Sequence, residues 1–200
     1  MPGTCARYHA AMLTLEALDT RRSAATRQLT APGPDDARLR RILRSAVRVP
    51  DHGRREPFRF IRIAGDARAR LAQLLCARLA QREPQAHPAV VDKLRDRFTA
   101  PPLTLALVCK QGPDEKIPAS ERFSSASCVG FALLQAAQAE GYGTQWLTGW
   151  PCYDRAVLDL LGLAEDELLI GTFGIGTPRE APAERERPDV DALLVDWTGA

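Results

Sequence analysis

The sequence has few of the features that mark nucleic-acid-binding, disulfide-stabilised or membrane proteins. Its formal net charge is only +2 and its pI is about 8.4, which is too mild for a concentrated basic nucleic-acid surface. The 5 cysteines form no C-x-x-C pair, so neither a disulfide framework nor a zinc site is predicted. No apolar run approaches the roughly 18 residues of a membrane span, and the N-terminus lacks a signal-peptide core. We therefore expect a cytoplasmic protein with no nucleic-acid partner and no membrane partner.

The common sequence motifs of enzyme active sites are also missing. There is no G-x-G-x-x-G after the first expected strand, no phosphate-binding P-loop, no H-E-x-x-H and no G-x-S-x-G. The three histidines, His9, His52 and His87, are scattered and predict no metal cluster. Because no side-chain catalyst is evident, an enzyme with this sequence would obtain its reactivity from a bound cofactor, and we name no catalytic residue and no metal ligand.

The remaining pattern indicates an α+β protein. With 45% hydrophobic residues, the chain can bury a sizeable core, and 200 residues suit a single domain, 1–200, with a lead-in at 1–11 and a C-terminal arm at 179–200. Helices are expected at 15–19, 36–47, 67–82, 89–98, 125–139 and 154–161, and strands at 57–63, 103–108 and 168–175, with a short segment at 145–149. Helices and strands interleave without a strict βαβ rhythm, which favours α+β over a doubly wound sheet.

The segment 124–148 is the centre of this pattern. From Ser125 to Ala139 it is small or apolar on every side, which predicts a buried helix, begun by serine caps and ended by Gly141 in a left-handed conformation. Such a helix needs either an enclosing core or a partner subunit. Cys109 and Cys128 lie in apolar runs and are expected to behave as small core residues.

Two polar groups could bind a ligand. Arg21, Arg22 and Ser23 follow the first short helix and offer fork-shaped donors and a hydroxyl suited to a phosphate. The alternative is an ordinary solvated helix end. Arg48 and His52 flank the turn that follows the second helix, where the plainer interpretation of His52 is a loop histidine bonded to water or to Asp51.

Taken in order, the motifs resemble the nitroreductase family of flavin mononucleotide (FMN) proteins, and most nearly its small bacterial NAD(P)H nitroreductases. The matching pieces are Arg21-Arg22-Ser23, Arg48-Val49-Pro50-Asp51-His52, Pro57-Phe58-Arg59-Phe60, Lys116-Ile117-Pro118, the helix through Cys128, Gly141-Tyr142-Gly143-Thr144-Gln145-Trp146 and Gly171-Thr172-Phe173-Gly174-Ile175-Gly176-Thr177-Pro178. No single piece is specific, but their joint order spans roughly residues 12–178.

The resemblance implies a central mixed or antiparallel sheet flanked by helices, in an intertwined homodimer with one FMN at each of two sites between the subunits. Arg21, Arg22 and Ser23 would hold the flavin phosphate and ribityl chain. Arg48 and His52 would come from the partner toward the flavin ring edge or ribityl oxygens. Trp146, Leu147 and Thr148 would line the cofactor beside the ring or the phosphate.

The implied reaction is hydride transfer from NAD(P)H through the flavin to nitroaromatic or quinone-like acceptors, in a ping-pong sequence. One position departs from the resemblance, because the subgroup tends to carry a basic residue where Leu147 stands and a serine where Thr148 stands. Either phosphate contact is weakened or another arginine substitutes. A flavin-binding or flavin-sequestering protein with little turnover is the alternative function, and a flavin-free dimeric scaffold is the third.

Overall fold

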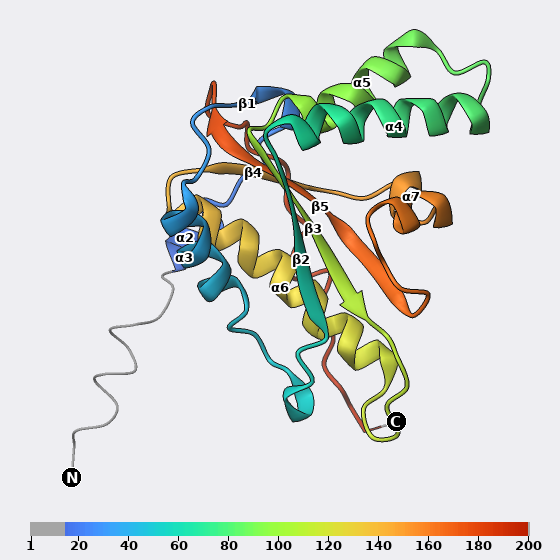
Figure 1. Cartoon of the computed structure of the whole chain (residues 1–200). Helices are drawn as coiled ribbons and strands as arrows, with labels where there is room; N and C mark the ends of the chain where they lie inside the picture. The colour runs from blue at the N-terminus through green and yellow to red at the C-terminus, as the bar shows by residue number, and fades with distance from the viewer. Residues whose placement is uncertain (1–14, 200) are drawn as a thin grey trace.

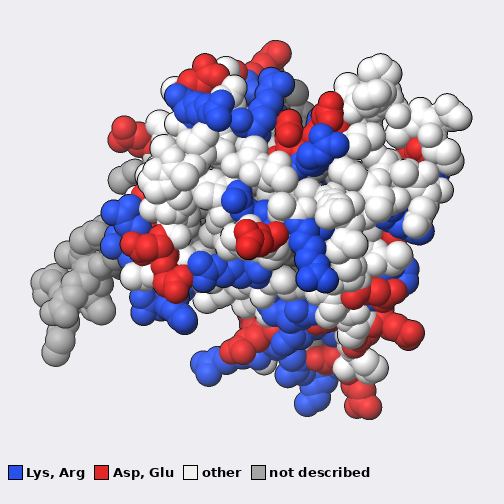
Figure 2. All heavy atoms as spheres, turned by 45° about the horizontal axis from the view of Figure 1, so that its top comes forward, with Lys and Arg blue, Asp and Glu red and all other residues white. Residues whose placement is uncertain are grey.

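The computed structural model describes residues 15–199, in which helices cover both faces of one antiparallel sheet (Figure 1). The expected lead-in at 1–11 lies outside the described residues. No helix in the described part of the chain is long and apolar enough to cross a membrane. Charged side chains of both signs are interspersed over the face shown in Figure 2.

The sheet is organised around its last strand. The strands are β1 (Leu29–Thr30), β2 (Phe58–Ala64), β3 (Leu103–Lys110), β4 (Gly143–Leu147) and β5 (Glu167–Pro178). Their order is β1-β5-β3-β2, and β4 pairs with the same strand β5, every pairing being antiparallel. All of β3 except Lys110 is buried, because its nearly continuous apolar sequence is covered on both faces.

The helices match the sequence pattern closely. They are α2 (Leu15–Asp19), α3 (Asp36–Ala46), α4 (Asp66–Arg82), α5 (Pro88–Thr99), α6 (Ala119–Ala139) and α7 (Arg155–Leu160), with 3-10 turns η1 (Thr26–Gln28), η2 (His52–Arg54) and η3 (Trp150–Cys152). The α+β class is therefore confirmed. Three elements, β1, η1 and η3, were not expected from the sequence.

Each face of the sheet has its own apolar core. On one face α3 and α6 pack over side chains that include Leu105 and Phe173. On the other face α4, α5 and α7 pack over Val108 and its neighbours, with Leu75 and Phe98 fully buried. In Figure 1 α6 runs along one side of the strands, and the α4–α5 pair lies beyond the other. These cores fix β4 and the two ends of α6, where the candidate site residues lie.

Helix α6 ends as the sequence predicts. Gly141 has φ 83°, a left-handed conformation that glycine adopts without a side-chain clash. Its N–H donates to the carbonyl of Gln138 at 2.9 Å, and the N–H of Tyr142 donates to the carbonyl of Ala137 at 2.9 Å. These two bonds form a Schellman motif, which satisfies the last carbonyls of the helix.

The beginning of α6 and the burial of its surface differ from the prediction. The helix starts at Ala119 after Pro118, six residues before the expected serine cap, because Pro118 loses no helical hydrogen bond at that position. One side of α6 is exposed, including Cys128, so the expectation that this cysteine is a core residue is wrong. Phe123 and Phe131 are 45% and 46% exposed on that side. The helix is therefore covered by the sheet and α3 but leaves one side open, where two phenylalanines and Cys128 lie beside polar residues such as Ser124.

Asp154 is a buried carboxylate that joins α7 to α4 on the side of the sheet that α4, α5 and α7 cover. It caps α7 by accepting the N–H of Val157 and it also accepts Arg78 and Arg82, at 3.0 and 2.6 Å, while its side chain is 2% exposed. Hydrogen bonds from Arg78, ahead of those from Arg82 and Val157, lower the pKa of the Asp154 carboxyl. The carboxylate therefore stabilises the fold above the pKa of an unfolded aspartate, about 3.9, and this stabilisation is lost as the pH falls through the lower folded value.

We expect Asp154→Asn to lower the free energy of unfolding at pH 7 by about 1.5–3 kcal/mol, since asparagine keeps the cap but loses charge-assisted bonds. The difference from wild type should shrink between pH 5 and pH 2, as measured by urea denaturation. Asp159→Asn is the matched control, because that carboxylate is 64% exposed and pairs only with Arg155 along α7. It should cost no more than about 0.5 kcal/mol. Equal losses for the two variants at pH 7 would contradict the assignment.

Candidate functional site

The Arg21–Ser23 segment lies beside the start of β4 and the end of α6. The backbone N–H of Arg22 donates to the side-chain oxygen of Gln138 at 3.3 Å. Two residues on, the N–H of Ala24 donates to the carbonyl of Thr144 at 3.1 Å. This segment therefore runs beside the edge of β4 that does not pair with β5, and one backbone hydrogen bond joins the two. The segment that carries the three expected phosphate ligands is thus held by two backbone N–H groups, that of Arg22 on α6 and that of Ala24 on β4.

The charge around Arg21 is strongly positive. Its guanidinium donates to the Ser23 hydroxyl at 3.2 Å. Partial burial lowers the pKa of Arg21, and the neighbouring guanidiniums of Arg187, Arg22 and Arg185 lower it further. Arg21 therefore lies among three other arginines, of which Arg22 and Arg187 pair with Glu184, and an anion bound at Arg21 would be stabilised.

The C-terminal arm supplies two of these arginines and one carboxylate. Glu184 pairs with Arg22 and, at 2.8 Å, with Arg187, whose guanidinium also donates to the carbonyl of Arg21 at 3.3 Å. A hollow of about 430 Å³ is lined by Leu18, Asp19, Arg21, Glu184 and Arg187. The arm therefore folds back over its own chain here, while its apolar end is exposed, with Trp197 89% accessible.

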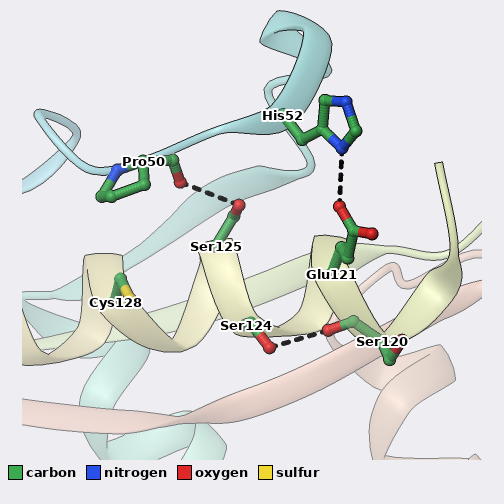
Figure 3. Close-up of a pocket in the computed structure, with 7 residues that line it drawn as sticks. All are labelled: Pro50, His52, Ser120, Glu121, Ser124, Ser125 and Cys128. Carbon is green, nitrogen blue, oxygen red and sulfur yellow. Dashed lines mark hydrogen bonds and ion pairs between the residues drawn. The ribbon is translucent and has the colours of Figure 1, made fainter.

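Arg48 and His52 lie at the other end of α6. His52 Nδ1 is 2.7 Å from the Glu121 carboxylate, and the Ser125 hydroxyl donates to the Pro50 carbonyl at 2.9 Å (Figure 3). The Arg48 side chain is exposed. A cavity of about 310 Å³ is lined by Pro50, His52, Ser120, Glu121, Ser124, Ser125 and Cys128. The loop after α3 is thus held on the first half of α6, with both basic side chains on the outside.

The chain does not bring its two sets of expected ligands together. Arg22 contacts Gln138 and His52 contacts Glu121, two positions of α6 that are 17 residues apart. At 1.5 Å per residue this separation is about 25 Å along the helix axis. The chain therefore carries the two sets of expected ligands at opposite ends of the same helix.

The third expected group lies at the end of β4. The Trp146 side chain points into the core, where its Nε1 donates to the Ile170 carbonyl at 3.1 Å and its ring centroid is 5.2 Å from that of Phe173. Gly130 gives this ring its space, because a Cβ there would meet the indole at 3.1 Å. Leu147 is half-buried and Thr148 is exposed. The Trp146 side chain therefore anchors the end of β4 and holds the next two residues in place.

A residue that the sequence reasoning missed contacts this strand end. Arg97, in the last turn of α5, donates to the carbonyl of Thr148 at 2.8 Å and to that of Leu147 at 2.9 Å. It also donates to the Thr172 hydroxyl at 2.6 Å. Nothing in the sequence of α5 separates Arg97 from its solvated neighbours Arg95 and Lys93. Within residues 15–199 no group of three or more histidine, cysteine or acidic side chains is placed to hold a metal ion.

Comparisons with known proteins agree on one family. The family model described as "Nitroreductase family" matches residues 18–177. The "Putative NAD(P)H nitroreductase YdjA" of Escherichia coli (strain K12) is 34% identical over 170 residues, which cover 84% of this chain and 90% of that protein. The nitroreductase-like family protein of Bacillus cereus has a TM-score of 0.79 at 22% identity, covering 94% of this chain and 100% of that one. A Desulfovibrio desulfuricans structure, described as a putative nitroreductase in complex with FMN, has a TM-score of 0.69 at 21% identity, covering 91% and 95%.

Proposed function

Because the chain belongs to the nitroreductase family, we propose that it is an FMN-dependent oxidoreductase with its flavin phosphate bound at Arg21, Arg22 and Ser23. The donor is NAD(P)H, as the names of its relatives indicate. The observation that carries the proposal is the arginine cluster at the edge of β4. Arg21 is held among like charges and beside a hydroxyl, and it pairs with no carboxylate among the described residues.

The residues present fit the phosphate end of FMN. Two guanidiniums can donate bidentate bonds to a phosphate, and the Ser23 hydroxyl can add a neutral one. The Glu184 carboxylate already occupies Arg22, so binding of the phosphate requires that Arg22 exchange this partner. The carboxylate shows that an oxyanion can be accommodated at this guanidinium. Leu147 and Thr148, at the end of β4, would line the cofactor. The Trp146 side chain, which is anchored to the Ile170 carbonyl, would keep them in position.

The ring end of the site requires a second copy of the chain. If two α6 helices pack antiparallel about a two-fold axis, the first half of one helix lies against the second half of the other. This arrangement places Arg48 and His52 of the partner subunit near Arg21 to Ser23, from which they are separated by about 25 Å of helix within one chain. The open apolar side of α6, with Phe123 and Phe131, supports this homodimer. We therefore propose two equal sites, each built from both subunits.

Bound FMN supplies the redox chemistry of such a site by relaying hydride from NAD(P)H to the acceptor. The chain's own contribution is binding, orientation and charge. Arg48 of the partner subunit would place a positive charge at the ring edge or ribityl oxygens, where it favours electron uptake, and His52 would add a hydrogen bond. No side-chain acid or base is needed for hydride transfer. Nitroaromatic and quinone-like compounds, as electron-poor acceptors, are the proposed substrates.

The first test is an absorption spectrum of the purified protein, incubated with FMN and desalted, followed by anaerobic NADPH and NADH. We expect a yellow protein that bleaches with one of the donors and regains its colour with a quinone. Yellow protein that neither donor bleaches would favour a flavin-sequestering protein. A colourless preparation that does not take up FMN would overturn the proposal.

A further inference from the structure

The C-terminal arm is joined to the rest of the chain by a small cluster of charged groups. After β5 the arm forms no helix or strand, and between 181 and 199 only Pro182 is partly buried. Among the described residues, two contacts are the only hydrogen bonds or ion pairs that join 181–199 to the rest of the protein. They are the ion pair of Glu184 with Arg22 and the bond from the Arg187 guanidinium to the Arg21 carbonyl. The polar attachments of the arm therefore all lie at the proposed phosphate site.

Glu184 is the centre of this attachment. Its Oε2 atom pairs with Arg22, while its Oε1 atom accepts the N–H of Arg185 and the guanidinium of Arg187, each at 2.8 Å. One carboxylate oxygen thus holds a local turn within the arm, and the other fastens that turn to Arg22. Loss of the Arg22 contact would leave the turn intact and remove the only ion pair that joins it to the rest of the described chain.

A phosphate group at this site would compete with Glu184. The hollow of about 430 Å³ is lined by α2 and Arg21 from the body of the protein, and by Glu184 and Arg187 from the arm. A phosphate bound to both Arg21 and Arg22 would lie beside the Glu184 carboxylate, and two negative groups at adjacent guanidiniums repel each other. The ion pair that the phosphate would replace is weak, because the Glu184 side chain is 50% exposed.

We propose that the arm is a strap, which Glu184 fastens at the site in the flavin-free protein and which a phosphate group bound at Arg21 and Arg22 releases. This inference rests on the proposed function, since it concerns how the flavin phosphate gains access to its arginines. Flavin loading and the position of the arm would then depend on each other: a fastened arm weakens FMN binding, and bound FMN frees the arm. Riboflavin, which has the ring and ribityl chain but no phosphate, should leave the arm fastened.

The test is the rate at which trypsin cleaves after Arg185, measured by mass spectrometry as release of the fragment 186–200. Cleavage reports the population of the released arm when fastening and release are fast. In wild type we expect FMN to raise this rate roughly three- to fivefold, the factor that corresponds to loss of one surface ion pair, and riboflavin to leave it unchanged. Glu184→Gln should be cleaved at the FMN-saturated rate without any ligand, and FMN should then have no further effect.

Glu186→Gln is the matched control. Glu186 is an exposed carboxylate on the other side of the same cleavage site, and it makes no hydrogen bond or ion pair with the described residues. This variant should behave as wild type. Each rate is divided by that of a peptide of residues 180–200 with the same substitution, which removes any effect of the substitution on trypsin itself.

Three results would overturn the inference. An unchanged cleavage rate in Glu184→Gln would show that this carboxylate does not hold the arm. A rate that is unchanged or slower when wild type binds FMN would show that the phosphate does not release it. Equal acceleration by FMN and riboflavin would show that the flavin ring moves the arm.

Failure of the proposed function has a different signature. Wild-type protein that quenches no flavin fluorescence would refute FMN binding. Inorganic phosphate would then take the place of FMN as the anion, and the same acceleration in wild type but not in Glu184→Gln is expected. Its absence at saturating phosphate would overturn the strap as well.

Discussion

The double variant Arg21→Ala/Arg22→Ala is expected to purify as a folded, colourless protein. Each arginine offers charge-assisted bonds to the phosphate, about 1.5–3 kcal/mol apiece. Because every 1.4 kcal/mol is a factor of ten, FMN affinity should fall by roughly two to four orders of magnitude. Folding should be spared, since the Arg22 contact with Gln138 uses the backbone N–H, which alanine retains. The measurements are FMN titration by fluorescence and thermal unfolding without flavin.

Two further variants sharpen this result. Arg27→Ala removes an exposed arginine from the same N-terminal segment and should leave FMN affinity unchanged. Glu184→Gln removes the carboxylate that competes for Arg22, and FMN should then bind somewhat more tightly. If the double variant retains wild-type flavin occupancy, Arg21 and Arg22 do not hold the phosphate, and the site must lie elsewhere in the family fold.

Much of the fold could be predicted because its signals are local. The apolar run at 103–108 predicted a strand covered on both faces, and it forms most of β3. The spacing of Leu39 and Ile42 marked the inner face of α3, and both residues are buried. Gly141 marked the end of α6, where its left-handed conformation makes a glycine favourable. The structural role of each of these residues follows from its neighbours in the sequence and from its burial.

The features that the sequence did not predict depend on contacts between residues that are distant in the sequence. β1 has only two residues and exists because Leu29 and Thr30 meet the end of β5, almost 150 positions later. Arg97 is one of many arginines, and only the approach of α5 to the end of β4 distinguishes it. The contact between Glu184 and Arg22 likewise depends on the path of the C-terminal arm. Composition and periodicity carry no information about such pairs.

The prediction that failed for Cys128 bears on the oligomeric state. A sequence that is apolar around the whole helix indicates burial but does not say which chain provides it. In the structure part of α6 is covered by its own chain and one side is open, with Cys128, Phe123 and Phe131 on the open side. A second copy of the chain that covered this side would explain both the apolar sequence of α6 and the separation of Arg48 and His52 from Arg21 to Ser23.

The variant Phe131→Glu is therefore expected to abolish both dimerisation and FMN binding. A charge at the centre of an apolar interface is desolvated without a partner, which destabilises the dimer by several kcal/mol. Light scattering should show a monomer for the variant and the proposed dimer for wild type, with FMN affinity reduced at least roughly 100-fold, because the proposed contribution of Arg48 and His52 of the partner subunit would be lost. Val90→Glu is the matched control: Val90 is 47% exposed on α5, away from the proposed interface, and this variant should remain dimeric and yellow. A Phe131→Glu monomer with full FMN occupancy would show that one subunit holds the cofactor alone, and a dimer unaffected by the change would move the interface away from α6.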